Sequence, residues 1–222
     1  MITKIFDCVA STNDELKKLK DPHEDTLYIA REQSGGRGSK GRSFECKKGG
    51  VYLSLLRLNP CRASESFNIM ISAALSVVNT LESIGVQAEI KWPNDIFVNG
   101  KKICGILIEN VFEGDMVARS IIGIGLNVNN RLSKKLSETA ITIEQIVGHK
   151  ADIDYITKGI VSELYKQHTI AEYKAKSGVI GKKITVIKDN KNYEAVAKDI
   201  LPDGNLLLES GEKLSAAEIT IR

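Results

Sequence analysis

The most informative stretch of the sequence is Gln33-Ser34-Gly35-Gly36-Arg37-Gly38-Ser39-Lys40-Gly41-Arg42, with four glycines and three cations in ten residues. Glycine lets a backbone turn tightly and approach a ligand closely, because it carries no Cβ. Cations beside such a loop match the charge of a polyphosphate. The stretch therefore predicts a loop that binds a nucleotide.

The loop does not fit the P-loop fold. Residues 36–43 differ from a Walker A motif at Arg42, where that motif has lysine. A P-loop opens into a helix whose N-terminus faces the phosphates. Here the next residues, 44–50, include two glycines and show no apolar period, so they predict no helix. The alternative that this segment alone leaves open is a flexible basic surface loop.

Composition indicates an ordinary globular protein. The chain has 222 residues, of which 42% are hydrophobic and 27% charged, enough for one large domain or a large one with a small one. The net charge of +3 argues against a nucleic-acid-binding surface. Apolar runs such as residues 103–108 are too short to span a bilayer, and no signal peptide is visible. We expect a cytoplasmic protein that binds neither nucleic acid nor membrane.

The cysteines give no metal pattern. Cys8, Cys46, Cys61 and Cys104 form no CxxC pair, and the three histidines do not complete a ligand set with them. We expect free thiols, as in a reducing compartment, and no structural zinc.

Periodicity predicts alternating strands and helices followed by a β-rich tail. The helices are expected at residues 64–84, with Ser64 as N-cap and Gly85 at C′, and at residues 152–174. The strands are expected at residues 27–30, 50–58, 87–91, 102–110 and 119–128, with a hairpin turn at Asn99-Gly100. The tail has short strands at residues 183–188, 193–199, 206–209 and 219–221, and turns at 189–190, 202–204 and 210–211. The tail therefore predicts a small barrel-like appendage.

Two segments place polar side chains where strands begin or end. Asn94 and Asp95 follow Lys91-Trp92-Pro93; Asn94 could read an adenine edge and Asp95 could hold Mg²⁺, although Pro-Asn-Asp alone is commonly a turn. Lys102 begins an apolar strand, where its charge could neutralise a carboxylate or phosphate. Gly105 within that strand suggests a ligand close to the backbone, or simply a bulge.

Two further segments suit ligand contact. Gly123-Ile124-Gly125-Leu126-Asn127-Val128-Asn129 could line a pocket as a strand with two glycines; the alternative is a bulged core strand. It lacks the third glycine and the following helix of a Rossmann fingerprint. Ser11-Thr12-Asn13 predicts first a helix N-cap, since acidic residues follow it, and a ligand could share its hydroxyls.

Taken together and in this order, the five motifs resemble those of the biotin protein ligases. The shared patterns are Ser-Thr-Asn, Gln-x-x-Gly-Arg-Gly-x-x-Gly-Arg, Lys-Trp-Pro-Asn-Asp, Lys-x-x-Gly-Ile-Leu-x-Glu and Gly-x-Gly-x-Asn-x-Asn. The resemblance implies an α+β fold: a mixed β-sheet with helices, related to class II tRNA synthetases, over residues 1–177, and a small SH3-like barrel over residues 178–222. Since the chain begins near Ser-Thr-Asn, the resemblance implies the monofunctional type, which lacks an N-terminal DNA-binding domain.

The resemblance also implies the reaction. Biotin and MgATP would give biotinyl-5′-AMP and pyrophosphate, and a lysine of a biotin carboxyl carrier domain, as in acetyl-CoA carboxylase, would then take the biotin. Lys102 and Arg37 would be the catalytic cations that hold the carboxylate and α-phosphate. The remaining biotin contacts would be Ser11, Thr12, Asn13, Gln33, Gly36, Gly105, Gly123, Gly125 and Leu126. The ATP contacts would be Arg37, Arg42, Lys91, Asn94, Asp95 and Asn127, and no metal ligand is fixed by the protein. Members can also pair edge to edge through their sheets, so a homodimer is among the implications.

The chain departs from the family pattern in its glycine-rich loop. Ser39 stands where the family usually has a second arginine, and Phe44 stands where tryptophan is common. We expect Ser39 to loosen the grip on the adenylate unless Lys40 compensates. Two rival functions remain open from the sequence: a lipoate or octanoate ligase of the same fold, and a non-catalytic biotin sensor.

Overall fold

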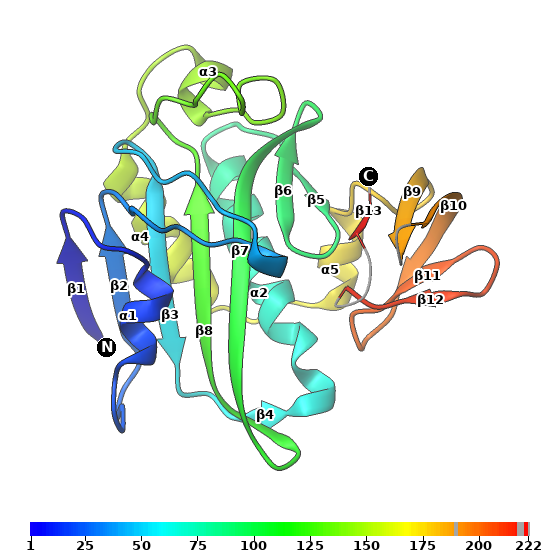
Figure 1. Ribbon diagram of the computed structural model, residues 1–222, viewed down its shortest axis with the longest axis horizontal. Helices are drawn as coiled ribbons and strands as arrows, with labels where there is room; N and C mark the ends of the chain where they lie inside the picture. The colour runs from blue at the N-terminus through cyan, green and yellow to red at the C-terminus, as the bar shows by residue number, and fades with distance from the viewer. Residues whose placement is uncertain (189–190, 217–219, 222) are drawn as a thin grey trace.

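The computed structural model describes residues 1–188, 191–216 and 220–221, which form two β-sheets and the helices packed on them (Figure 1). The large sheet runs in the order β1 (Ile2–Phe6), β2 (Thr26–Ala30), β3 (Val51–Arg57), β8 (Met116–Leu126), β7 (Lys101–Glu113), β6 (Asp95–Val98) and β5 (Glu89–Lys91). The short β4 (Cys61–Arg62) also pairs with β8. β1 and β2 are parallel and the other pairs are antiparallel, so the sheet is mixed and the α+β prediction is confirmed.

The two faces of the large sheet are covered differently, because successive side chains along a strand point to opposite faces. One face carries Leu55 and Ile122 into the main core, beneath α2 (Phe67–Ser83), α4 (Ile153–Leu164) and α5 (Ile170–Ala175). The other face carries Leu56 and Ile121 into a smaller cluster with Leu16 of α1 (Thr12–Lys17). Because α1 is short, it covers only part of that face.

The predicted helix ends are partly right. Gly85, with φ of +80°, follows α2 as predicted, and its N–H donates to the Glu82 carbonyl. Ser64 is wrong as the N-cap: it lies in a 3₁₀ turn, Ala63–Glu65, in which the Glu65 carboxylate accepts from the Arg62 N–H. The cap of α2 is Ser66.

The single long helix predicted at residues 152–174 is also wrong, because α4 ends at Leu164 and α5 begins at Ile170. Thr169 starts the second helix by a capping box: its hydroxyl accepts from the Glu172 N–H, and the Glu172 carboxylate accepts from the Thr169 N–H.

The predicted strands are present, and several are longer than predicted. Some further elements had no prediction from the sequence. The turn at Asn99-Gly100 is confirmed, with both residues at positive φ. β7 and β8 continue to Glu113 and back from Met116, beyond the ranges predicted. β1, β4 and the short α3 (Ile143–Val147) had no prediction.

The C-terminal sheet is antiparallel. Its order is β12 (Lys213–Leu214), β11 (Leu206–Leu208), β10 (Lys191–Ile200), β9 (Lys183–Lys188) and β13 (Thr220–Ile221). The turn predicted at 189–190 lies outside the described residues. Buried residues of this sheet belong to the same apolar core as α2, and the Trp92 indole Nε1–H donates to the Gly204 carbonyl at 2.9 Å. The two sheets are therefore packed together.

Candidate functional site

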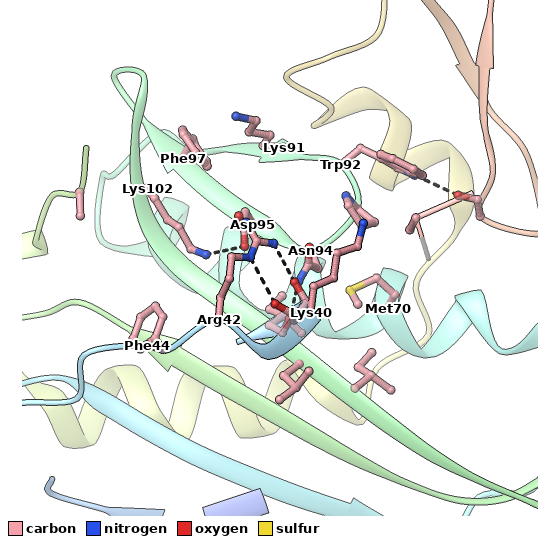
Figure 2. Close-up of a pocket in the computed structure, with 18 of the residues that line it drawn as sticks. Lys40, Arg42, Phe44, Met70, Lys91, Trp92, Asn94, Asp95, Phe97 and Lys102 are labelled. Atoms are coloured by element: carbon pink, nitrogen blue, oxygen red, sulfur yellow. Dashed lines mark hydrogen bonds and ion pairs between the residues drawn. The ribbon is translucent and has the colours of Figure 1, made fainter. Parts of the chain in front are cut away.

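Two adjoining cavities lie where the glycine-rich loop crosses the open face of the large sheet. The larger has a volume of about 970 Å³ and the smaller about 100 Å³. They share a wall made by the loop residues Ser39, Arg42, Ser43 and Phe44 and by the sheet residues Asn94, Asp95, Lys102, Ile106 and Leu107. Figure 2 shows Lys102, Asp95, Arg42 and Phe44 gathered at this junction.

The floor of the small cavity is made by glycines of β7 and β8, as the motifs predicted. Gly105 and Gly125 are paired across the two strands, and the Phe44 ring lies over both. A Cβ at Gly125 would come within 2.7 Å of that ring, and one at Gly123 within 2.4 Å of Asn13 Oδ1. The floor therefore has no room for side chains of its own, and a flat group, here the Phe44 ring, can lie directly on the backbone.

One end of the small cavity is a network of hydrogen bonds between α1, β3 and the start of the loop. The N–H and hydroxyl of Thr12 both donate to Gln33 Oε1, at 2.7 and 3.0 Å. The Thr12 hydroxyl also lies 2.6 Å from that of Ser54, which donates to Asn13 Oδ1 at 2.5 Å. Ser11 caps α1 as predicted, accepting from the Asp14 N–H. These donors and acceptors suit a small polar ring rather than an apolar one.

Arg37 lies at the rim of the small cavity among charges. Its Nη2 lies 2.6 Å from Asp14 Oδ1 and donates to both Glu109 carboxylate oxygens at 3.1 Å. Glu109 also accepts from Lys17 Nζ at 2.6 Å and from Asn13 Nδ2 at 2.9 Å. Burial acts to raise the pKa of Glu109, but these donors and the Arg37 charge outweigh it and hold the pKa below its usual value.

Lys102 stands at the junction of the cavities. Its Nζ lies 2.7 Å from Asp95 Oδ1, and its N–H and carbonyl are bound by the Thr139 carbonyl and the Ile141 N–H, at 2.9 and 3.0 Å. The backbone of Lys102 is therefore held from both sides, which fixes the base of its side chain.

The loop cation Arg42 also reaches the junction, and it is held within its own loop. Its Nε donates to the Ser39 carbonyl at 3.2 Å and its Nη2 to the Ser39 hydroxyl at 2.9 Å. Ser39, Lys40 and Gly41 form a 3₁₀ turn that faces the large cavity.

Besides Arg42 and Asp95, three more predicted nucleotide contacts line the large cavity, and their polar groups are partly engaged. Asn94 Nδ2 donates to the Ile106 carbonyl at 2.7 Å, and Asn127 Oδ1 accepts from Asn130 Nδ2 at 3.1 Å. Lys91 Nζ lies 4.9 Å from the centroid of the Phe97 ring. The amides of Asn94 and Asn127 therefore hold the cavity wall in shape.

Two predicted biotin contacts do not line either cavity. Gly36 lies where a Cβ would come within 2.4 Å of the Phe44 carbonyl and 2.5 Å of Cys46 Sγ, so close packing explains this glycine. Leu126 is fully buried in the main core on the other face of the sheet. The other predicted site residues all line one or both cavities: Ser11, Thr12, Asn13, Gln33, Arg37, Arg42, Lys91, Asn94, Asp95, Lys102, Gly105, Gly123, Gly125 and Asn127.

Sequence reasoning missed several residues of the site. Glu109 closes the quoted Lys-x-x-Gly-Ile-Leu-x-Glu pattern, but the resemblance assigns it no role, and the sequence around Asp14 predicts only the start of a helix. Ser54 gave no signal, because it sits in an apolar strand. Residues 203–205, 215 and 216 of the C-terminal sheet unit line the large cavity, and no local pattern indicated that.

In the part of the chain that the structure describes, no three His, Cys, Asp or Glu side chains gather into a metal site. All four cysteines are free thiols, as predicted. No described helix combines the length and apolar character needed to cross a bilayer.

The sequence matches the model of the Biotin/lipoate A/B protein ligase family over residues 5–127. A bifunctional ligase/repressor BirA of Bacillus subtilis is 32% identical over 243 residues, covering 97% of this chain and 72% of the relative. A biotin–[acetyl-CoA-carboxylase] ligase of Mycobacterium tuberculosis is 25% identical, covering 83% of this chain and 73% of the relative.

The fold is similar to that of solved structures. The biotin protein ligase from Aquifex aeolicus, in complex with biotin and ATP, superimposes with a TM-score of 0.81 at 26% identity. The match covers 100% of this chain and 98% of that one.

Proposed function

The chain belongs to the biotin/lipoate A/B protein ligase family, and on that premise we propose that it is an ATP-dependent biotin–protein ligase. Its first step would join biotin to AMP with release of pyrophosphate. Its second would transfer the biotinyl group to a lysine of a biotin carboxyl carrier domain, such as that of acetyl-CoA carboxylase. The names of its relatives and the biotin and ATP bound by a structural neighbour support this assignment.

The observation that carries the proposal is the shared wall of the two cavities. A ligase that makes an acyl-adenylate must bring a carboxylate against the α-phosphate of a nucleotide, and proximity supplies much of the rate. Lys102 and Arg42 are the cations that line both cavities, so they stand where the two ligands would meet. The volume of about 970 Å³ is ample for a nucleotide.

Biotin would occupy the small cavity and extend to the junction. Its ring system would lie on the floor made by Gly105, Gly123 and Gly125, with its polar atoms at the hydroxyls of Ser11 and Thr12 and the amide of Gln33. The acid chain would then point to Lys102. Phe44, which lies on the same floor, would have to move aside and could close over the ligand.

The charges at the junction suit the first step. A carboxylate oxygen of biotin attacks the α-phosphorus, a C–O–P linkage forms, and the bond to the β-phosphate oxygen breaks to release pyrophosphate. This brings like charges together, so Lys102, Arg42 and Arg37 would offset them. ATP would enter as its Mg²⁺ complex, as a substrate, and Asp95 is the carboxylate at the junction that could approach the ion.

In the second step the amine of the carrier lysine attacks the acyl carbon, an amide forms, AMP leaves and the amine loses a proton. The acyl-adenylate must be kept from water until the carrier arrives. The loop over the junction would supply that protection.

The proposal extends to further features that the resemblance to biotin protein ligases implies. The antiparallel C-terminal sheet would be the SH3-like barrel, with the boundary between residues 177 and 178. The protein would act in the cytoplasm, without nucleic acid or membrane, and two copies could pair edge to edge.

Mass spectrometry of a carrier domain incubated with the protein, biotin and MgATP tests the function. We expect a gain of one biotinyl group that requires ATP, and biotin-dependent exchange of pyrophosphate into ATP. Exchange supported by lipoate or octanoate instead of biotin would identify the rival ligase. Biotin binding with neither exchange nor transfer would identify a sensor.

A further inference from the structure

Glu109 is a charged residue at the site that the proposed reaction does not use. It lies on β7 on the same face as Gly105, four residues away, since side chains alternate along a strand. It lines neither cavity, although its neighbours Ile108 and Asn110 line the large one. Three donors from two separate parts of the chain nevertheless converge on its carboxylate: Asn13, Lys17 and Arg37.

The donors tie Glu109 to two segments that line the small cavity, α1 and the glycine-rich loop. Asn13 belongs to the hydrogen-bonded end of that cavity, since it accepts from Ser54. Arg37 belongs to the glycine-rich loop, which also lines the small cavity. One carboxylate therefore bridges the end of the cavity and the loop that covers it.

Of the two carboxylates that pair with Arg37, Glu109 is the more buried. The Glu109 side chain is 25% exposed, whereas the side chains of Asp14 and Arg37 are 42% and 40% exposed. Asp14 adds a second negative charge to Arg37, at 2.6 Å. The other loop arginine, Arg42, bonds to Ser39 within the loop, so its bonds do not fasten the loop to the sheet.

We propose that Glu109 is a positioning residue that holds the glycine-rich loop against the biotin site through Arg37 and thereby slows the escape of bound biotin. The inference rests on the proposed function, because it names what the loop retains. Glu109 acts through Arg37 and touches no substrate.

Glu109→Gln is the sharpest variant. The amide keeps the size of the side chain and one carbonyl oxygen for Asn13, and it removes the charge that Arg37 needs. We expect biotin to dissociate about fivefold faster, near the upper range for an ion pair of this exposure. The KM for biotin should rise with it, while the KM for ATP should change by less than about twofold.

Glu113→Gln is the matched control, because Glu113 is exposed on the same strand and lies outside both cavities. It should leave the biotin dissociation rate unchanged. Thermal unfolding of both variants separates a local effect from loss of the fold.

The decisive measurement is a double-mutant cycle with Arg37→Gln. If Glu109 acts through Arg37, adding Glu109→Gln to Arg37→Gln should not accelerate biotin dissociation further. Independent, multiplicative effects of the two changes would overturn the inference, as would an unchanged dissociation rate in Glu109→Gln. Failure of the wild-type protein to bind biotin would instead refute the proposed function.

Discussion

The ammonium nitrogen of Lys102 lies 2.7 Å from Oδ1 of Asp95, so the junction cation already has a carboxylate partner. Arg37 is matched in the same way by Asp14 and Glu109. An incoming carboxylate or phosphate therefore competes with the Asp95 carboxylate for Lys102. Binding becomes an exchange of partners, which keeps the desolvated charges paired throughout.

Removing the junction cation should stop the chemistry. We expect Lys102→Ala to raise the activation free energy of biotin-dependent pyrophosphate exchange by on the order of 2–4 kcal/mol, as for loss of one oxyanion-hole donor. The control is Lys101→Ala, since Lys101 donates to the Ser137 carbonyl and lines neither cavity. If Lys102→Ala kept full pyrophosphate exchange and carrier labelling, Lys102 would not be a catalytic residue.

The glycine floor should not tolerate a methyl group. A Cβ at Gly125 would come within 2.7 Å of the Phe44 ring, so Gly125→Ala must displace either the ring or the ligand. We expect biotin affinity, measured by calorimetry, to fall at least about tenfold. The double variant with Phe44→Ala relieves the ring contact and should remain weak, because the ligand needs the same space. Full recovery of affinity in the double variant would show that only Phe44 was disturbed.

Restoring the family's arginine at position 39 should strengthen the binding of biotinyl-5′-AMP. Ser39 lines both cavities, so an arginine there would reach the junction and add a charge-assisted bond. We expect biotinyl-5′-AMP to dissociate about tenfold more slowly from Ser39→Arg, a change of about 1.4 kcal/mol. Ser39→Gln supplies length without charge and should give a smaller change. An unchanged off-rate in Ser39→Arg would show that the missing arginine does not matter here, as Lys40 compensation would predict.

The indole of Trp92 should link stability to nucleotide binding. Trp92→Phe removes the donor to the Gly204 carbonyl and should destabilise the protein by about 1–3 kcal/mol in chemical unfolding. Because residues 203–205 line the large cavity, the KM for ATP should rise as well. The control is Tyr193→Phe, which removes a bond to Glu212 at the surface of the same sheet. Equal effects on KM in both variants would contradict a specific link.

The cysteines should differ in reactivity with pH. Burial raises the pKa of the Cys46 thiol to about 11, even though the hydrogen bond from Gln33 acts to lower it. Raising a thiol pKa keeps the thiol protonated, so Cys46 should resist alkylation until the pH nears that value, whereas exposed Cys8 reacts first. Iodoacetamide labelling followed by mass spectrometry at pH 7 to 10 measures this order. Equal labelling of Cys46 and Cys8 at pH 8 would mean that the loop opens readily.

Features set by neighbouring residues were predictable from the sequence. Asn99-Gly100 gives the hairpin turn, Ser11 gives the cap of α1, and the glycines of β7 and β8 mark the cavity floor. The break between α4 and α5 was also readable, because Thr169 and Glu172 form a capping box, but apolar periodicity concealed it.

Features set by distant residues were not predictable. β1, with the sequence Ile-Thr-Lys-Ile-Phe, does not alternate apolar and polar residues regularly, and its place beside β2 is set by pairing with distant residues. Arg37 and Glu109 are 72 positions apart, and Trp92 and Gly204 are 112 apart. No local pattern reports such a contact, and these contacts decide how the loop and the C-terminal sheet meet the cavities.

The only parallel pair described in the large sheet, β1 with β2, has a consequence for assembly of the site. Parallel neighbours require a crossover, and here the crossover contains α1. The crossover that places β2 beside the edge strand β1 thus also presents Thr12 and Asn13 to the small cavity. A ligand bound at Thr12 and Asn13 would therefore also stabilise the amino-terminal edge of the large sheet.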